Sequence, residues 1–173
     1  MENTQVGPFR ILKRLGRSRR HQVFHAIHES QQREVALKFI SFPDHIEWEA
    51  GVDKIERETA ELMKLRHENL VRIYGVGVHE QESQVFFATE LVEGESLSSI
   101  LARRGKLTPD LVVEYGHQIS QALEYLHECD VIHTKLTPDK ILVTPDLKSK
   151  FLICGLTALK SVVGIRRRNG IWS

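Results

Sequence analysis

The sequence predicts an α+β fold with two lobes: a first lobe of five strands and one helix, and a mainly helical second lobe. Three observations predict this arrangement. Apolar and polar residues alternate over most of the first ninety residues, as they do in strands, and one stretch there has helical spacing. The longest helical pattern of the chain follows a change of composition at 92–96. A cleft between two lobes is a usual place for a small ligand.

The first three strands are predicted by short alternating stretches that polar turns separate. They are residues 9–16, 22–29 and 33–40, which should form an antiparallel meander. Helical spacing follows from about Asp44 to Arg66, and we expect the helix to begin after Gly51, because glycine is a poor helix former. Residues 69–78 and 85–92 predict a second pair of strands.

The second lobe begins after a hinge at residues 92–95, so the predicted units are 1–91, 92–95 and 96–173. A short helix over 96–105 has Ser96 as its cap and Gly105 as its stop. A long helix over 107–130 has Thr108 as its cap and Pro109 in its first turn. Its apolar stripe consists of Val112, Tyr115, Ile119, Ala122, Leu123 and Leu126. Two short strands are predicted at 141–144 and 150–153.

Composition excludes several classes of protein. The chain has 24 Lys and Arg against 23 Asp and Glu, so its charge does not point to nucleic acid as a partner, and the arginines at 166–168 form too short a run to change this. Since no apolar run approaches 18 residues, we expect no membrane segment. The N-terminus lacks the pattern of a secretory signal, and Cys129 and Cys154 are expected to be free thiols in a reducing cytoplasm.

Several motifs occur in an order and at spacings that resemble the protein kinase family, from about Phe9 to Lys160. They are VALK (35–38), RETAELMKLRHENLVRIYGV (57–76), TELVEGESL (89–97), VIHTKLTPDKIL (131–142) and FLICGLT (151–157). The resemblance implies the two-lobed protein-kinase-like fold, with a five-stranded N-lobe and a partial, mainly helical C-lobe. The family continues with further helices, so we expect a chain that ends at Ser173 to be truncated within the C-lobe.

The resemblance also implies a nucleotide site. Lys38 would contact ATP and Glu58 would pair with it, while Thr89 would be the gatekeeper beside the adenine. Backbone groups of the hinge and apolar side chains from both lobes would complete the site: Glu90, Val92, Val23, Ala36 and Leu142. Only Gly16 remains of the glycine-rich loop, and the arginines that follow suggest either a solvated basic turn or a metal-free anion site.

The catalytic positions depart from the family. Where the family has Asp, Lys, Asn and the metal-binding Asp, this chain has Lys135, Thr137, Lys140 and Ile153. A charged lysine cannot accept a proton, and isoleucine has no atom that could bind magnesium. His133 is expected to be structural. The sequence therefore predicts the walls of an active site without its catalytic groups.

We accordingly expect a pseudokinase that regulates or scaffolds other proteins, such as an active kinase, with at most weak ATP binding and without magnesium. One alternative is a weak or atypical kinase that uses a displaced carboxylate, for which Asp139 and Asp146 are the candidates. Another is a truncated fragment without a function of its own. The motif HENLVRIYGVG and Thr89 favour the tyrosine-kinase or tyrosine-kinase-like branch.

Overall fold

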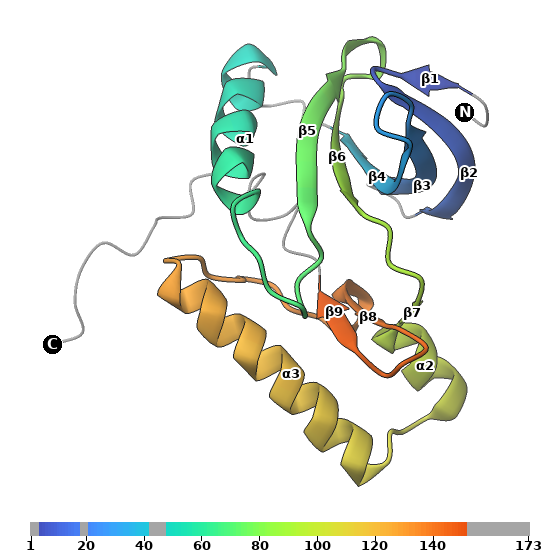
Figure 1. The fold of residues 1–173 in the computed structure, drawn as a ribbon, viewed down its shortest axis with the longest axis vertical. Helices are drawn as coiled ribbons and strands as arrows, with labels where there is room; N and C mark the ends of the chain where they lie inside the picture. The colour runs from blue at the N-terminus through green and yellow to red at the C-terminus, as the bar shows by residue number, and fades with distance from the viewer. Residues whose placement is uncertain (1–3, 18–20, 42–47, 152–173) are drawn as a thin grey trace, which may run out of the picture.

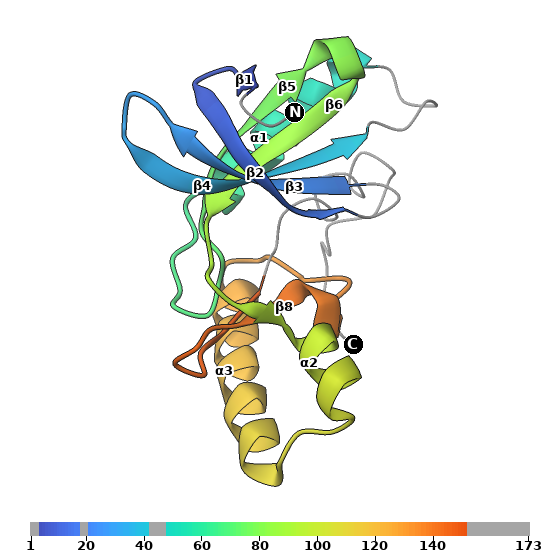
Figure 2. The same cartoon turned by 90° about the vertical axis from the view of Figure 1, so that its right-hand side faces the viewer.

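The computed structural model describes residues 4–17, 21–41 and 48–151 (Figure 1). They form two lobes that Figure 2 shows one above the other, with a β-sheet and α1 in the first lobe and α2 and α3 in the second. The elements of the first lobe are β1 (Gln5–Val6), β2 (Phe9–Arg17), β3 (His21–His28), β4 (Arg33–Ser41), α1 (Trp48–Leu62), β5 (Ile73–His79), the 3-10 helix η1 (Glu80–Glu82) and β6 (Gln84–Glu90). Those of the second lobe are β7 (Glu95–Ser96), α2 (Leu97–Arg104), α3 (Pro109–Glu128), the 3-10 helix η2 (Pro138–Lys140), β8 (Ile141–Val143) and β9 (Ser149–Phe151).

The sheet of the first lobe has the strand order β1-β2-β3-β4-β6-β5. The antiparallel meander predicted for β2, β3 and β4 is confirmed. The sheet has one strand more than the predicted five, because Gly7 adopts a φ of 54° and turns the chain so that Gln5 and Val6 pair with β2. The predicted strand over 69–78 begins only at Ile73, because residues 69–71 pair instead with the second lobe.

Each face of this sheet covers a separate hydrophobic core, because successive side chains of a strand point to opposite faces. On the outer face, away from α1, Leu37 of β4 packs in one cluster with Phe24 of β3. On the inner face, Phe87 of β6 packs in a second cluster with Ile55 of α1, and this cluster continues into the second lobe as far as Phe151. The inner core therefore spans both lobes.

Helix α1 begins before Gly51, contrary to the prediction. It starts at Trp48, and Gly51 lies buried within its first turns. The prediction weighed only the low helix propensity of glycine, about 1 kcal/mol relative to alanine. Tertiary packing decides here, since Gly51, Ile55, Thr59 and Leu62 form the buried face of the helix.

The short helix α2 has both of the predicted end signals. The Ser96 hydroxyl accepts a hydrogen bond from the Ser99 amide at 3.1 Å, and Gly105 closes the helix with a φ of 76°. For α3, Thr108 occupies the predicted cap position but its side chain makes no capping hydrogen bond, while Pro109 is the first residue of the helix.

This difference between the caps predicts a difference in stability. Ser96→Ala should lower the free energy of unfolding by about 1 kcal/mol, because it leaves the Ser99 amide without its acceptor. Thr108→Ala, the matched control at the other helix start, should lower it by less than about half of that, because no side-chain bond is lost. Urea unfolding of the two variants beside the parent chain measures both values, and equal losses would contradict the capping argument.

Most of the predicted apolar stripe of α3 is confirmed, with Tyr115, Ala122 and Leu126 buried. Val112 is an exception, because 56% of it is exposed, and its neighbour Val113 is 72% exposed. The helical period places Val112 on the same stripe, but the first turn of α3 lies at the end farthest from the sheet (Figure 1). Periodicity assigns the face of a helix and cannot assign how far along it the packing extends.

The two lobes are joined through the backbone as well as through the core. Phe151 of β9 donates a hydrogen bond to the carbonyl of Asn69, and its own carbonyl accepts one from Val71, each at 3.0 Å. The adjacent linker docks on α3, where the Arg66 amide donates to the Tyr125 hydroxyl at 2.9 Å. The segment that leads from α1 to β5 therefore belongs to both lobes.

Candidate functional site

The roof of the predicted nucleotide site is formed by β3, β4 and β6. Lys38 of β4 is half-buried and lies opposite Val23 of β3 and Phe87 of β6 in the strand register. Ala36 is also half-buried, and its carbonyl lies 3.4 Å from the hydroxyl of Thr89, which is itself buried. Four of the predicted nucleotide-site residues therefore lie on neighbouring positions of one sheet.

The connection between the lobes follows β6. Thr89 also lies within 3.3 Å of the carbonyl of Glu90, and the Glu90 amide donates to the carbonyl of Arg72. Gly94 lies so close to β8 that a Cβ there would be 2.6 Å from the carbonyl oxygen of Val143. Gly94 is thus required by a close approach of two backbones. Val92, the other predicted hinge residue, is half-buried.

The floor of the site comes from β8. Leu142 is half-buried and pairs with Ser96 of β7, which directly follows the connection between the lobes. In the predicted site, Leu142 would contribute from the second lobe, and Val23 and Ala36 would contribute from the first. Glu58 lies half-buried on α1, next to the buried Ile55 and Thr59 that pack below the sheet. Its pairing with Lys38 stays a prediction.

The loop at 131–140 shows what the substituted residues do. Lys135 is exposed. The ammonium group of Lys140 donates a hydrogen bond to the backbone carbonyl of Lys135. Lys140 thereby closes the loop onto itself. The His133 ring packs edge-on against Phe151, with 5.6 Å between ring centroids, in agreement with its predicted structural role.

Asp139, one of the two candidate carboxylates, interacts electrostatically with one lysine of each lobe. A hydrogen bond from the side chain of Thr137 lowers the pKa of Asp139, and the positive charges of Lys140 and Lys38 lower it further. Burial lowers the pKa of His21 on β3, and the charge of Lys38 adds to this effect. The carboxylate of Asp139 in the second lobe thus lies near enough to Lys38 and His21 of the first lobe for their charges to interact.

Asp146, the other candidate, lies in the turn between β8 and β9. The Thr144 hydroxyl donates to it at 2.5 Å and lowers the pKa of its carboxyl group, with smaller contributions from Lys148 and Lys150. These neighbours belong to its own hairpin. Asp146 therefore has the role of a turn residue, and of the two candidates only Asp139 shares its field with Lys38.

Part of the predicted site lies outside the described residues. Ile153 falls there, as do the arginines at 19 and 20, and Gly16 lies exposed on β2, close to where the description of that strand ends. Within the described ranges, no three His, Cys, Asp or Glu side chains lie close enough to share a metal ion. In the same ranges, no helix has the length and apolar character needed to cross a bilayer. Cys129 is a free, exposed thiol.

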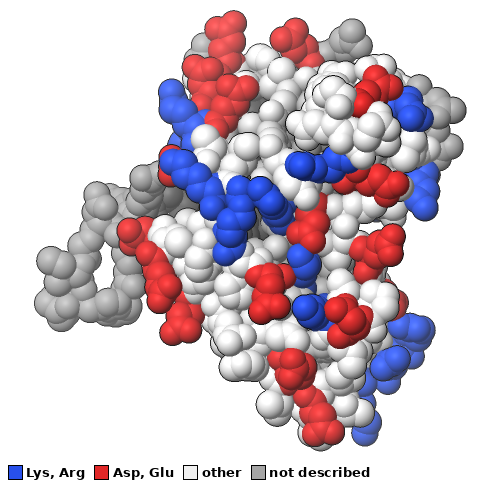
Figure 3. Space-filling model, viewed as in Figure 1, with Lys and Arg blue, Asp and Glu red and all other residues white. Residues whose placement is uncertain are grey.

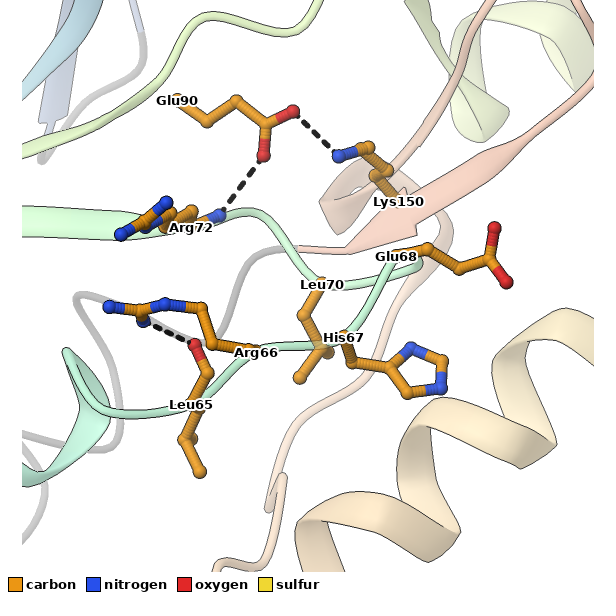
Figure 4. A pocket seen from close by; sticks show the side chains of 8 residues that line it. All are labelled: Leu65, Arg66, His67, Glu68, Leu70, Arg72, Glu90 and Lys150. Atoms are coloured by element: carbon orange, nitrogen blue, oxygen red, sulfur yellow. Dashed lines mark hydrogen bonds and ion pairs between the residues drawn. The ribbon is translucent and has the colours of Figure 1, made fainter.

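A cavity of about 400 Å³ lies behind the connection between the lobes, and the sequence did not predict it (Figure 4). Its walls come from the linker after α1, from Arg72 and Glu90, and from Lys150 on β9. Lys150 and Glu90 form an ion pair at 2.6 Å, and the second carboxylate oxygen of Glu90 accepts from the Arg72 amide at 3.2 Å. In this hinge-side cavity, the charges of Glu90 and Lys150 are therefore paired with each other.

Comparison with known proteins decides the family. The family model of the protein kinase domain matches residues 9–157. The chain belongs to the protein kinase family. This confirms the family resemblance and, with the two lobes described above, the kinase-like α+β fold.

Three of the similar kinases come from two plants and a bacterium. CBL-interacting serine/threonine-protein kinase 16 of Arabidopsis thaliana is 32% identical over 94% of this chain and 34% of its own length. CBL-interacting protein kinase 20 of Oryza sativa subsp. japonica is 35% identical over 91% of this chain and 35% of its own. Serine/threonine-protein kinase PknD of Mycobacterium tuberculosis is 34% identical over 82% of this chain and 21% of its own.

The kinase chain described here thus spans about a third or less of the length of these relatives. Two of the three are named as serine/threonine kinases, so the branch inferred from the sequence stays a prediction. The assignments of individual nucleotide-site residues also stay predictions.

Proposed function

We propose that this kinase domain is a pseudokinase that regulates or scaffolds other proteins and does not transfer phosphate. The observation that carries the proposal is the state of Lys140. It stands at the position of a metal-binding asparagine in the family, and its ammonium group bonds to the backbone of Lys135, which stands at the position of the proton-accepting aspartate. Both positions therefore hold hydrogen-bond donors in place of acceptors.

Magnesium does not fit this set of side chains. The ion prefers hard oxygen ligands in octahedral geometry, whereas Lys135 and Lys140 bring two positive charges and Ile153 brings an alkyl group. Phosphoryl transfer in the family depends on positioning and on neutralisation of the charge that spreads over the phosphate oxygens. Loss of the proton acceptor alone would reduce the rate by a factor of about 10²–10⁴.

The side chains expected to contact adenine depart less from the family pattern than those at the catalytic positions do. Val23 and Ala36 above and Leu142 below remain apolar and half-buried, and Lys38 supplies a positive charge between them and α1. These features support weak nucleotide binding without magnesium, and we include it in the proposal as a residual property of the fold. These features do not replace the missing proton acceptor or the missing metal ligands.

The test is a phosphotransfer assay on the full chain with labelled ATP and a mixture of protein substrates. We expect no magnesium-dependent transfer above the level of the Lys38→Ala variant. Lys13→Ala, which changes an exposed lysine of β2, is the matched control for loss of a lysine. Transfer that stops on chelation, persists in Lys13→Ala and is lost in Lys38→Ala would overturn the proposal.

A weak or atypical kinase is the second candidate, and the position of Asp139 favours it. This carboxylate feels the charge of Lys38 and its pKa is lowered, so it is ionised at neutral pH. If transfer is seen, Asp139→Asn should abolish it while Asp146→Asn leaves it unchanged. The third reading, a fragment without a function, predicts that the chain lacks a cooperative thermal transition.

A further inference from the structure

A second cavity lies on the outer face of the first-lobe sheet, and we call it the sheet-face cavity. It measures about 430 Å³ and is lined by Arg33, Val35, Arg66, Arg72, Tyr74 and Gly75, among others. This volume is in the range of cavities that hold small ligands or side chains. It contains none of the nucleotide-site residues inferred above.

The hollow arises from an irregularity in β5. The pairing of β5 with β6 shifts between Ile73 and Gly75, so that Gly75 lies on the outer face together with Tyr74, which packs against the outer core. Gly75 pairs with Ala88, whose side chain lies on the outer face. A Cβ at Gly75 would meet nothing within 4 Å. Two small residues therefore leave an apolar depression beside Tyr74.

The rim of this depression is positively charged. Arg33 and Arg72 lie over the Tyr74 ring, with their Cζ atoms 4.8 and 5.6 Å from its centroid. Among the residues that the structure describes, neither guanidinium forms an ion pair or a hydrogen bond, and no Asp or Glu lines the cavity. Lys and Arg side chains gather on this face between the lower end of α1 and the start of β5 (Figure 3).

The nearby acid does not neutralise this rim. Glu90 is engaged with Lys150 and with the backbone amide of Arg72, on the side of the hinge-side cavity. The guanidinium groups of Arg66 and Arg72 extend to the other side, away from that ion pair (Figure 4). Arg66 is held in place by the carbonyl of Leu65 at 2.6 Å. The exposed side of the cavity therefore combines the positioned guanidinium of Arg66, the guanidinium groups of Arg33 and Arg72 over Tyr74, and an apolar floor.

We propose that the sheet-face cavity docks an acidic peptide segment of a partner protein, with one apolar side chain in the hollow and carboxylates over Arg33 and Arg72. The positively charged rim favours a negatively charged ligand. Carboxylates suit it because a guanidinium binds them through two parallel hydrogen bonds. The three arginines come from β4 and from both parts of the segment between α1 and β5, around an apolar floor, so they match several acids spaced along a chain. This proposal rests on the proposed function, since it gives the protein-binding role a surface.

The probe is a fluorescein-labelled peptide of sequence EEEFEE, titrated with the full chain and followed by fluorescence anisotropy. The peptides EEEGEE and KKKFKK test the apolar and the charged parts separately. We expect EEEFEE to bind more tightly than both, and its affinity to fall when salt is raised from about 0.05 M to about 0.3 M. Equal affinity for EEEFEE and KKKFKK, or no measurable binding of EEEFEE, would overturn the proposal.

Two variants locate the binding. Arg33→Gln combined with Arg72→Gln should weaken EEEFEE binding at least about tenfold, because two charge-assisted contacts are lost. Gly75→Leu should weaken it comparably by filling the hollow. Arg104→Gln combined with Lys106→Gln, which removes two exposed charges near the end of α2, should change it by less than about twofold. Unchanged binding in the Arg33/Arg72 variant would overturn the proposal.

Hydrogen exchange of the parent chain with saturating EEEFEE provides a readout that needs no variant. Protection should concentrate at the starts of β4 and β5, whereas protection at β3 and residues 131–140 would place the peptide in the nucleotide cleft and contradict the docking site.

The result of the peptide-binding experiments can be separated from that of the phosphotransfer test. A chain that transfers phosphate yet binds the peptide through Arg33 and Arg72 contradicts the proposed function alone, and an inactive chain whose binding ignores these arginines contradicts the docking site alone.

Discussion

Replacing Phe151 with alanine should lower the free energy of unfolding by about 3–5 kcal/mol, because the side chain is fully buried in the core that spans both lobes. The ring also supports the edge-on contact with His133. Its backbone bonds to Asn69 and Val71 remain in the variant, so the loss reports on the side chain. Urea unfolding followed by circular dichroism measures it, with the slope of the transition checked for a change of mechanism.

Phe151→Leu is the matched variant. Leucine keeps most of the apolar volume and loses the ring, so we expect a loss below about 1.5 kcal/mol. If alanine and leucine cost the same, the ring would not fill the space between the lobes as the structure places it. Because the same core joins the two lobes, the alanine variant should also unfold both lobes in a single transition.

The second large effect is expected at Gln118 of α3. Its side-chain oxygen accepts hydrogen bonds from the Ser149 amide at 2.6 Å, from the Ser149 hydroxyl at 2.9 Å and from the Asn69 amide group at 3.3 Å. Ser149 and Asn69 are both buried. Gln118→Ala would leave the Ser149 amide and hydroxyl without this acceptor, while Asn69 keeps its bond to the Ser149 carbonyl, and we expect a loss of about 2–3 kcal/mol in the free energy of unfolding.

Gln121→Ala is the control, because Gln121 is exposed on the same helix, and it should stay within about 0.5 kcal/mol of the parent chain. Ser149→Ala should have an intermediate effect, since Gln118 still accepts from the Ser149 amide. The order Gln118, Ser149, Gln121 in decreasing loss is the expected result of the urea titrations. A loss at Gln118 no larger than that at Gln121 would mean that water replaces this network without cost.

Local patterns predicted most of the elements. Alternation found β2, β3 and β4, end signals found α2, and helical spacing found α1 and α3, because each of these signals lies within a few neighbouring residues. The substituted positions Lys135, Thr137 and Lys140 were also visible in the sequence, since side-chain chemistry does not depend on the fold. The extent of packing along α3 was not visible, as Val112 shows.

The candidate site divides in the same way. The resemblance named the wall residues Val23, Ala36 and Leu142, which lie on strands of the two lobes. That the charge of Lys38 acts on Asp139, whereas Asp146 interacts with its own hairpin, could not be predicted, because both follow short strand-like or loop segments with similar composition. The two cavities were likewise absent from any sequence signal.

The sequence by itself determined the family, the main elements and the exchange of acids for amines in the catalytic loop. Tertiary structure decided that β6 lies between β4 and β5, that Lys140 bonds to the backbone of Lys135, and that Arg33 and Arg72 meet over Tyr74. The physical reason is separation along the chain. Propensities and spacing act between near neighbours, whereas strand order, buried hydrogen bonds and surface charge depend on residues that only folding brings together.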